Sequence, residues 1–336
     1  MNQDPVKVNH VDWTSVLPSL HLGKALKFSY RARTLVVAIV AVLLVQLVLW
    51  LFGLNSQNAL RGWNRGLLDS VQRSENPIQV LMTISWLMLT SSEIAITKLT
   101  IVFLMAQIIA LAFGIEIARA VACEFCVQER SGAWRNLKLM ARRIPDAIKI
   151  AVAFLAFGFI AFLPILVIRL FQLVFGSSPI LSTLWPVLSL VAIPVLFVWL
   201  VLLVTGPFAA AAIATDDCEP ADAVSRSINY VLSHKLQVVL LISASFTLAR
   251  LSGGLAELLL SLSMGVTAAD LPTSLTDVRR SFPFGFGAEN ASWISMVQVI
   301  AAAVEFAVLQ SALTIGYVLL RKTEDSVPYR ELSPVD

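Results

Sequence analysis

The chain has 336 residues, of which 57% are hydrophobic and only 14% are charged, and its formal net charge at pH 7 is +3. This composition, with a strongly positive mean hydropathy, excludes an ordinary soluble domain, in which about a quarter of the residues are charged. The net charge says little by itself, because in a membrane protein the loops that hold the Lys and Arg residues matter more. Three cysteines, Cys123, Cys126 and Cys218, are too few for a disulfide scaffold and are interpreted as reduced thiols.

Six stretches have the length and composition of membrane spans, since a crossing helix needs about 20 mostly apolar residues. The first follows 34 residues of polar and basic sequence, too long for the start of a signal peptide, and no small-residue cleavage site follows it, so we expect a retained span. The expected fold class is an all-α integral membrane bundle of six transmembrane helices, with an N-terminal segment 1–34, a membrane domain 35–320 and a tail 321–336. The six stretches run approximately over 35–54, 95–118, 150–175, 184–212, 236–263 and 293–320.

Residues 78–90 form an uncharged run between the first and second expected spans. Its length suits a re-entrant or surface helix better than a crossing; as a seventh span it would move the N-terminus to the other side. Charge favours six spans. With both termini and the segments 116–149 and 216–235 in the cytoplasm, most Lys and Arg residues outside the spans lie on that side. We therefore expect a multi-pass protein of the cytoplasmic (inner) membrane with both termini in the cytoplasm.

Two segments of similar layout, Arg119 to Lys149 and Asp216 to Lys235, each join an inward-going span to an outward-going one. This predicts two related hairpins, each with an amphipathic helix in the cytoplasmic headgroup zone and its apolar face toward lipid. Ordinary structural elbows are the simpler interpretation, and binding of lipid or of a protein partner is the alternative. In the first segment the residues expected to face lipid or a partner are Trp134, Arg135, Lys138 and Arg142.

Two short pieces of sequence carry a resemblance to known membrane proteins. They are Ala118-Arg119-Ala120-Val121-Ala122 with Glu129-Arg130, and Ala223-Val224-Ser225-Arg226-Ser227-Ile228-Asn229-Tyr230-Val231 after an acidic turn. Both resemble multi-spanning bacterial proteins of unassigned function, most like those of planctomycetes. The second is also similar to the A-L-x-R-S-x-x-L segment of the membrane domain that accompanies some glycerophosphodiester phosphodiesterases. The resemblance implies a helical membrane fold; the catalytic phosphodiesterase domain itself is not expected in this chain.

Four ionisable residues lie inside the expected spans, where charge is costly and is usually paired or faces a cavity. Counting along the helices from their cytoplasmic ends places Arg250 and Glu305 at similar depth, so these two can meet. Arg169 and Glu257 lie nearer the outer boundary and could form a second pair. Static locks between helices are the favoured interpretation, and a proton or substrate path is the alternative.

Candidate metal ligands are few. Cys123 and Cys126 have metal or redox spacing, and Cys218 with His234 could complete a zinc site, but such cysteine pairs often occur near helix ends without metal. The histidines are scattered, and neither a catalytic triad nor a phosphate-binding glycine loop is visible. We therefore expect no metal, no cofactor and no nucleic-acid partner, and an enzyme is the less favoured class.

The favoured function is a non-catalytic inner-membrane scaffold, or a subunit of a larger membrane assembly. Such a protein would contact membrane lipids and either another membrane protein or a second copy of itself. The alternative is a transporter or channel in which Arg250 and Glu305 line a polar path.

Overall fold

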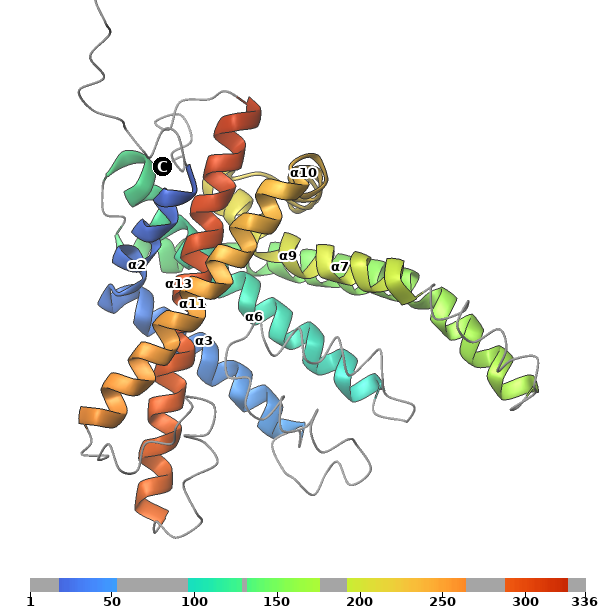
Figure 1. The fold of residues 1–336 in the computed structure, drawn as a ribbon, viewed down its shortest axis with the longest axis horizontal. Helices are drawn as coiled ribbons and strands as arrows, with labels where there is room; N and C mark the ends of the chain where they lie inside the picture. The colour runs from blue at the N-terminus through green and yellow to red at the C-terminus, as the bar shows by residue number, and fades with distance from the viewer. Residues whose placement is uncertain (1–17, 53–95, 129–131, 176–191, 264–287, 326–336) are drawn as a thin grey trace, which may run out of the picture.

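In the computed structural model every regular element of the described residues is a helix, which confirms the expected all-α class for that part of the chain (Figure 1). The helices follow from the apolar runs, because a helix satisfies all backbone hydrogen bonds within one segment, as lipid requires. The described residues are 18–52, 96–128, 132–175, 192–263 and 288–325.

The elements in chain order are the 3-10 turn η1 (Pro18–Gly23), α2 (Lys24–Ser29), α3 (Ala32–Leu51), α6 (Ile96–Ala122), the π-helical turn η2 (Cys123–Val127), α7 (Ala133–Phe175), α9 (Ala192–Asp216), α10 (Pro220–Ser233), α11 (Lys235–Ser263) and α13 (Ala288–Asp325).

Four helical stretches are long and apolar enough to cross a membrane: Ala32–Leu51, Thr100–Val127, Lys235–Leu260 and Met296–Lys322. They coincide with the first, second, fifth and sixth expected spans, and they identify a membrane protein. The third and fourth expected spans fall in α7 and α9, where many side chains lie outside the described residues. The count of six therefore stays a prediction, and the run 78–90 lies outside the described residues altogether.

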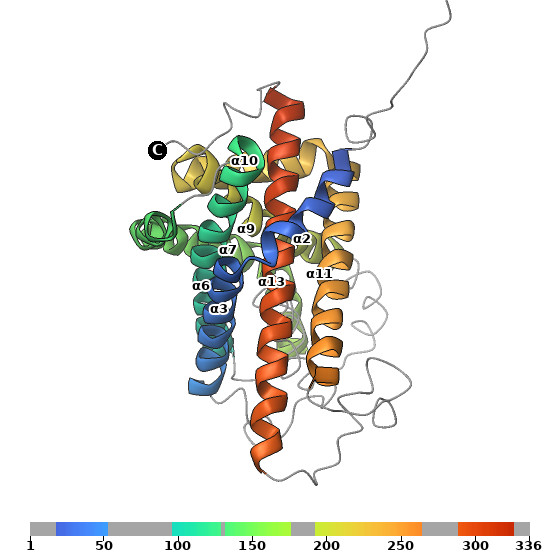
Figure 2. The ribbon, with the colours of Figure 1, turned by 90° about the vertical axis from the view of Figure 1, so that its left-hand side faces the viewer.

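Helix α13 is the centre of the bundle. It contacts α2, α3, α6, α9 and α11, and 89% of the apolar window within Met296–Lys322 is buried, against 33% within Lys235–Leu260. Figure 2 shows α13 running the full height of the molecule with the other helices around it. The contact with α11 is close, since a Cβ atom at Gly253 would lie 3.3 Å from both the Ala301 carbonyl oxygen and Glu305 Cβ.

Helix α3 begins about halfway along α13, as both ribbon views show (Figures 1 and 2). The hydroxyl of Ser29, at the end of α2, marks this register: it lies 3.0 Å from Ser311 Oγ and 3.2 Å from the Ala307 carbonyl oxygen, and its closest acceptor is the Ala25 carbonyl of its own helix at 2.6 Å. Phe28 on the same short helix is buried against the core. The segment before the first span thus packs into the bundle, and its end lies beside the middle of α13.

The segment Arg119 to Lys149 is divided between two helices. Arg119 belongs to α6 and is only 5% exposed, so it does not lie on a basic surface loop. Helix α7 then runs without a break from Ala133 to Phe175, through Pro145, and joins the amphipathic part to the expected third span.

The second amphipathic segment is built differently from the first. Helix α10 begins with Pro220, which suits the first turn because its missing N–H has no acceptor there. It ends at His234, whose backbone is not helical, and α11 starts anew at Lys235. Its inner face, with Val224 and Tyr230, is buried in the protein core. Ile228 and Val231 pack partly against the same core, and Leu232 is exposed. Most of the apolar face of α10 therefore contacts protein, which contradicts the expectation that the face as a whole lies on lipid.

Candidate functional site

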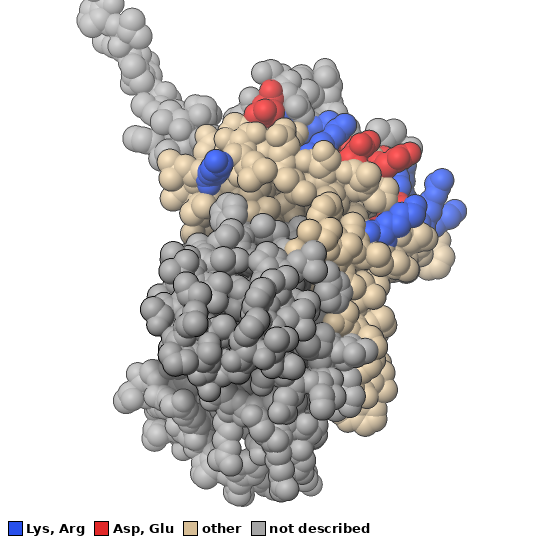
Figure 3. Space-filling model, turned by 90° about the vertical axis from the view of Figure 1, so that its right-hand side faces the viewer, with Lys and Arg blue, Asp and Glu red and all other residues tan. Residues whose placement is uncertain are grey.

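On the face shown in Figure 3, the charged side chains of the described residues gather near one end of the molecule. We call this the charged end; it comprises α10 and the last turns of α6, α9 and α13. At its centre Asp216 closes α9 with a side chain only 4% exposed. Its carboxylate accepts hydrogen bonds from Tyr317 (3.0 Å) and Arg226 (3.3 Å), and Arg321 forms an ion pair with it. Asp216 thus ties α9, α10 and α13 together.

Three further side-chain contacts, two made by Arg143 and one by His234, hold the turns at the charged end. Arg143 on α7 binds Asp146 at 2.7 Å and also pairs with Asp217, whose φ of 51° turns the chain between α9 and α10. The hydrogen bond to Asp146 raises the pKa of Arg143 above its ordinary value. His234 Nε2 lies 2.6 Å from Glu324 Oε2 on α13. Together these pairs fix α7, α10 and α13 against one another.

The cysteines lie close to this end but do not share a ligand set. His234 contacts Glu324, as described above, and no group of three or more potential metal ligands occurs within the described residues. The three cysteines are free thiols. Burial, followed by the charge of Asp216, raises the pKa of Cys218 above its ordinary value, so this thiol stays protonated at neutral pH.

The first half of α7 carries an uncovered apolar face, which we call the α7 face: Trp134, Leu137, Ile144 and Ile148. Trp134 is 79% exposed, and the other three side chains are also exposed. Arg135, Lys138 and Arg142 are exposed as well. The opposite side of α7 is anchored in the protein through Asn136, Ala147 and Ile150, which are buried. All four residues that the sequence assigned to this site are therefore accessible to lipid or to a partner.

Arg250 and Glu305 meet between α11 and α13, with Arg250 Nε 3.0 Å from Glu305 Oε1. Glu305 is 9% exposed and Arg250 is 64% exposed, so the arginine lies on the outside of the bundle. Glu305 precedes Ser311 by six residues, or about 9 Å of helix, so the pair lies not far below the level at which α3 begins. Gly253 packs tightly against the same turn of α13.

The second expected pair is described only in part. Glu257 lies on α11 and is half-buried. Arg169 lies on α7, but its side chain is outside the described residues, so a contact between the two stays a prediction.

If the Arg250–Glu305 contact is a static lock, its two members should be energetically coupled. We expect Arg250→Gln and Glu305→Gln each to lower the free energy of unfolding. The loss in the double variant should be smaller than the sum of the two single losses by about 1 kcal/mol. Thermal unfolding of the four proteins in one detergent measures this coupling. Strictly additive losses would show that the contact stabilises nothing.

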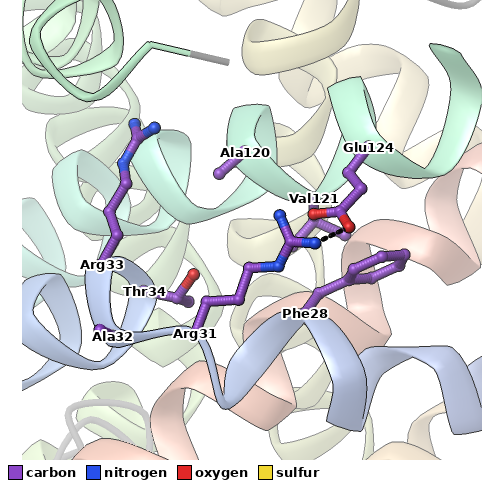
Figure 4. A pocket seen from close by; sticks show the side chains of 8 residues that line it. All are labelled: Phe28, Arg31, Ala32, Arg33, Thr34, Ala120, Val121 and Glu124. Carbon is purple, nitrogen blue, oxygen red and sulfur yellow. Dashed lines mark hydrogen bonds and ion pairs between the residues drawn. The ribbon is translucent and has the colours of Figure 1, made fainter. Parts of the chain in front are cut away.

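Two arginines at the start of the first span also pair with carboxylates on α6. Arg33 Nε lies 3.0 Å from Oε1 of Glu116, which is 2% exposed, and Arg31 pairs with Glu124. Beside these pairs lies a pocket of about 310 Å³ between the start of α3 and the end of α6 (Figure 4).

Sequence reasoning did not identify Asp216, Glu116 or the arginines that begin α3 as site residues. Their positions could have indicated that they are paired, since Glu116 and Asp216 are acidic residues at the inner ends of expected spans, where an unpaired carboxylate would be costly. Their partners come from distant parts of the chain, and nothing in the local sequence names them.

Comparison of the chain with protein-family models, with curated proteins and with solved structures finds no match.

Proposed function

We propose that this protein is a non-catalytic scaffold of the bacterial inner membrane, or a subunit of a larger membrane assembly, that works through lipid and protein contacts. The observation that carries the proposal is the α7 face: an apolar strip led by Trp134, flanked by exposed Arg135, Lys138 and Arg142, on a helix anchored from its other side. Such a surface suits the headgroup zone, where aromatic rings and basic side chains bind well.

The charged end is proposed to face the cytoplasm, with both termini on that side. Support comes from the basic residues Arg31 and Arg33 at the start of α3 and from the basic residues of α7, since Lys and Arg gather at cytoplasmic membrane boundaries. The charged residues there form a network that rigidifies the helix ends, as a scaffold requires.

The transporter alternative has less support. Arg250 is mostly exposed on the outside of the bundle, where lipid would lie, and Gly253 brings α11 into close contact with α13 at the level of Glu305. A lock between two adjacent helices accounts for both observations.

Site-specific photo-crosslinking tests the proposal. A benzophenone amino acid in place of Trp134 is expected to crosslink one protein of defined mass in intact membranes, or a second copy of this chain. The matched control is the same probe at Leu236, which is 74% exposed at the other elbow and should give no such product. Crosslinks to lipid alone at position 134 would reject the subunit role.

A further inference from the structure

The pocket between α3 and α6 has a lining that fits an anion. Four consecutive lining residues, Arg31 to Thr34, form the first turn of α3. The first hydrogen bond of this helix runs from the Leu35 N–H to the Arg31 carbonyl at 3.0 Å. The N–H groups of residues 32–34 therefore have no acceptor inside the helix, and the positive end of the helix dipole is directed at the pocket.

Thr34 supplies the second, independent observation. Its side chain is only 3% exposed, and Figure 4 shows its hydroxyl between the side chains of Arg31 and Arg33, on the pocket side. Thr34 lines the pocket, its oxygen is open to it, and the described part of the chain provides no hydrogen bond to this hydroxyl. A hydroxyl that opens into a pocket and has no protein partner is satisfied by water or by a bound ligand, and here it is placed to donate to an anion.

The charges of the lining favour an anion, although one carboxylate opposes it. Arg31 reaches across the pocket to Glu124 (Figure 4). A guanidinium has five N–H donors, so a ligand can share Arg31 with Glu124. Arg33 also belongs to the lining, but it is paired with the buried carboxylate of Glu116, so the attraction for an anion comes mainly from Arg31 and the first turn of α3.

The surface next to the pocket is apolar and continues along α3. Arg33, Val36, Val40, Leu43 and Leu47 follow a three- or four-residue spacing, so they share one face of the helix. The four apolar members are exposed. An acyl chain could lie on this strip below a phosphate in the pocket.

We propose that the pocket between α3 and α6 binds the phosphate of an anionic phospholipid, held by the first turn of α3, the Thr34 hydroxyl and Arg31. The site lies apart from the α7 face, so the inference holds whether or not α7 binds a partner. The apolar strip on α3 favours a lipid over a free phosphate as the source of the phosphate group.

Lipid titration followed by native mass spectrometry tests the proposal on the full-length protein in detergent. We expect phosphatidylglycerol to bind more tightly at the first site than phosphatidylcholine. Thr34→Val keeps the shape of the side chain and removes the hydroxyl, and should weaken the first phosphatidylglycerol about tenfold. Glu124→Gln removes the competing carboxylate and should strengthen it several-fold, an increase that misfolding cannot produce.

Two alanine variants separate the pocket from the general surface. Ala120→Leu fills the pocket without changing charge and should abolish the first binding step. Ala141→Leu, at an exposed position of α7, is the matched control and should bind as the parent does. Thermal midpoints of all variants show whether each remains folded.

Several results would overturn the proposal. One is equal binding of the two lipids by the parent; another is unchanged phosphatidylglycerol binding in both Thr34→Val and Ala120→Leu. Inorganic phosphate is titrated in parallel. If these variants lose affinity for phosphate alone while lipid binding is unchanged, the ligand is a soluble anion and not a lipid.

Discussion

Replacement of Asp216 by Asn is expected to destabilise the protein by about 3 kcal/mol, the largest loss that we expect from a single substitution. The side chain of Asp216 is 4% exposed and binds Arg321, Arg226 and Tyr317. Without its charge, Arg321 on α13 stays 16% exposed beside a neutral group, and removal of one partner of a buried pair is costly. Thermal unfolding in detergent, followed by intrinsic fluorescence, measures the loss.

The neighbouring residue provides the control for this substitution. Asp217 has a side chain 53% exposed and pairs with Arg143, so Asp217→Asn should cost well under 1 kcal/mol, as exposed pairs generally do. Asn also tolerates the positive φ at this position. Equal losses for the two variants would contradict the central role of Asp216.

Gly253→Leu should separate α11 from α13 and lower the free energy of unfolding by about 2 kcal/mol, because overpacking of a tight contact forces the backbone apart. A Cβ atom there would already lie 3.3 Å from the Ala301 carbonyl oxygen and from Glu305 Cβ. Chemical unfolding of the purified protein gives the difference in stability.

Gly254→Leu is the matched control. A Cβ atom at Gly254 meets nothing within 4 Å, and the substitution removes a glycine from a helix, which by itself is favourable. A neutral or stabilising effect is therefore expected. Similar destabilisation by both substitutions would mean that helix propensity or lipid contact, and not packing on α13, decides the effect.

The expected spans and the observed helices agree best where the prediction depends only on the local sequence. An uninterrupted apolar run predicts a helix in lipid regardless of its neighbours, and α3, α6, α11 and α13 each overlap the expected stretch. The meeting of Arg250 and Glu305 could also be proposed, because two ionisable residues at similar depth in consecutive spans have few other partners. Helix ends are less well predicted: α6 continues through Arg119 to Ala122, beyond the expected end of the second span at residue 118.

The parts of the site that sequence reasoning missed depend on tertiary contacts. Asp216 pairs with Arg321, more than one hundred residues further along the chain. The pocket forms only because the start of α3 lies next to the end of α6. The position of the start of α3 along α13 is set by the contact of Ser29 with Ser311. Helix α10 has an amphipathic pattern that suits a membrane surface, and the same pattern suits a helix that packs on α9.

The central position of α13 has a consequence for biosynthesis. The ribosome makes this helix after all the helices that it contacts, so α2, α3, α6, α9 and α11 enter the membrane before their common packing surface exists. The buried polar groups that face α13, such as Ser29 and Asp216, must wait for Ser311 and Arg321. Assembly of the bundle is therefore a late, largely post-insertion event, and a nascent chain stalled before α13 would be exposed to membrane quality control.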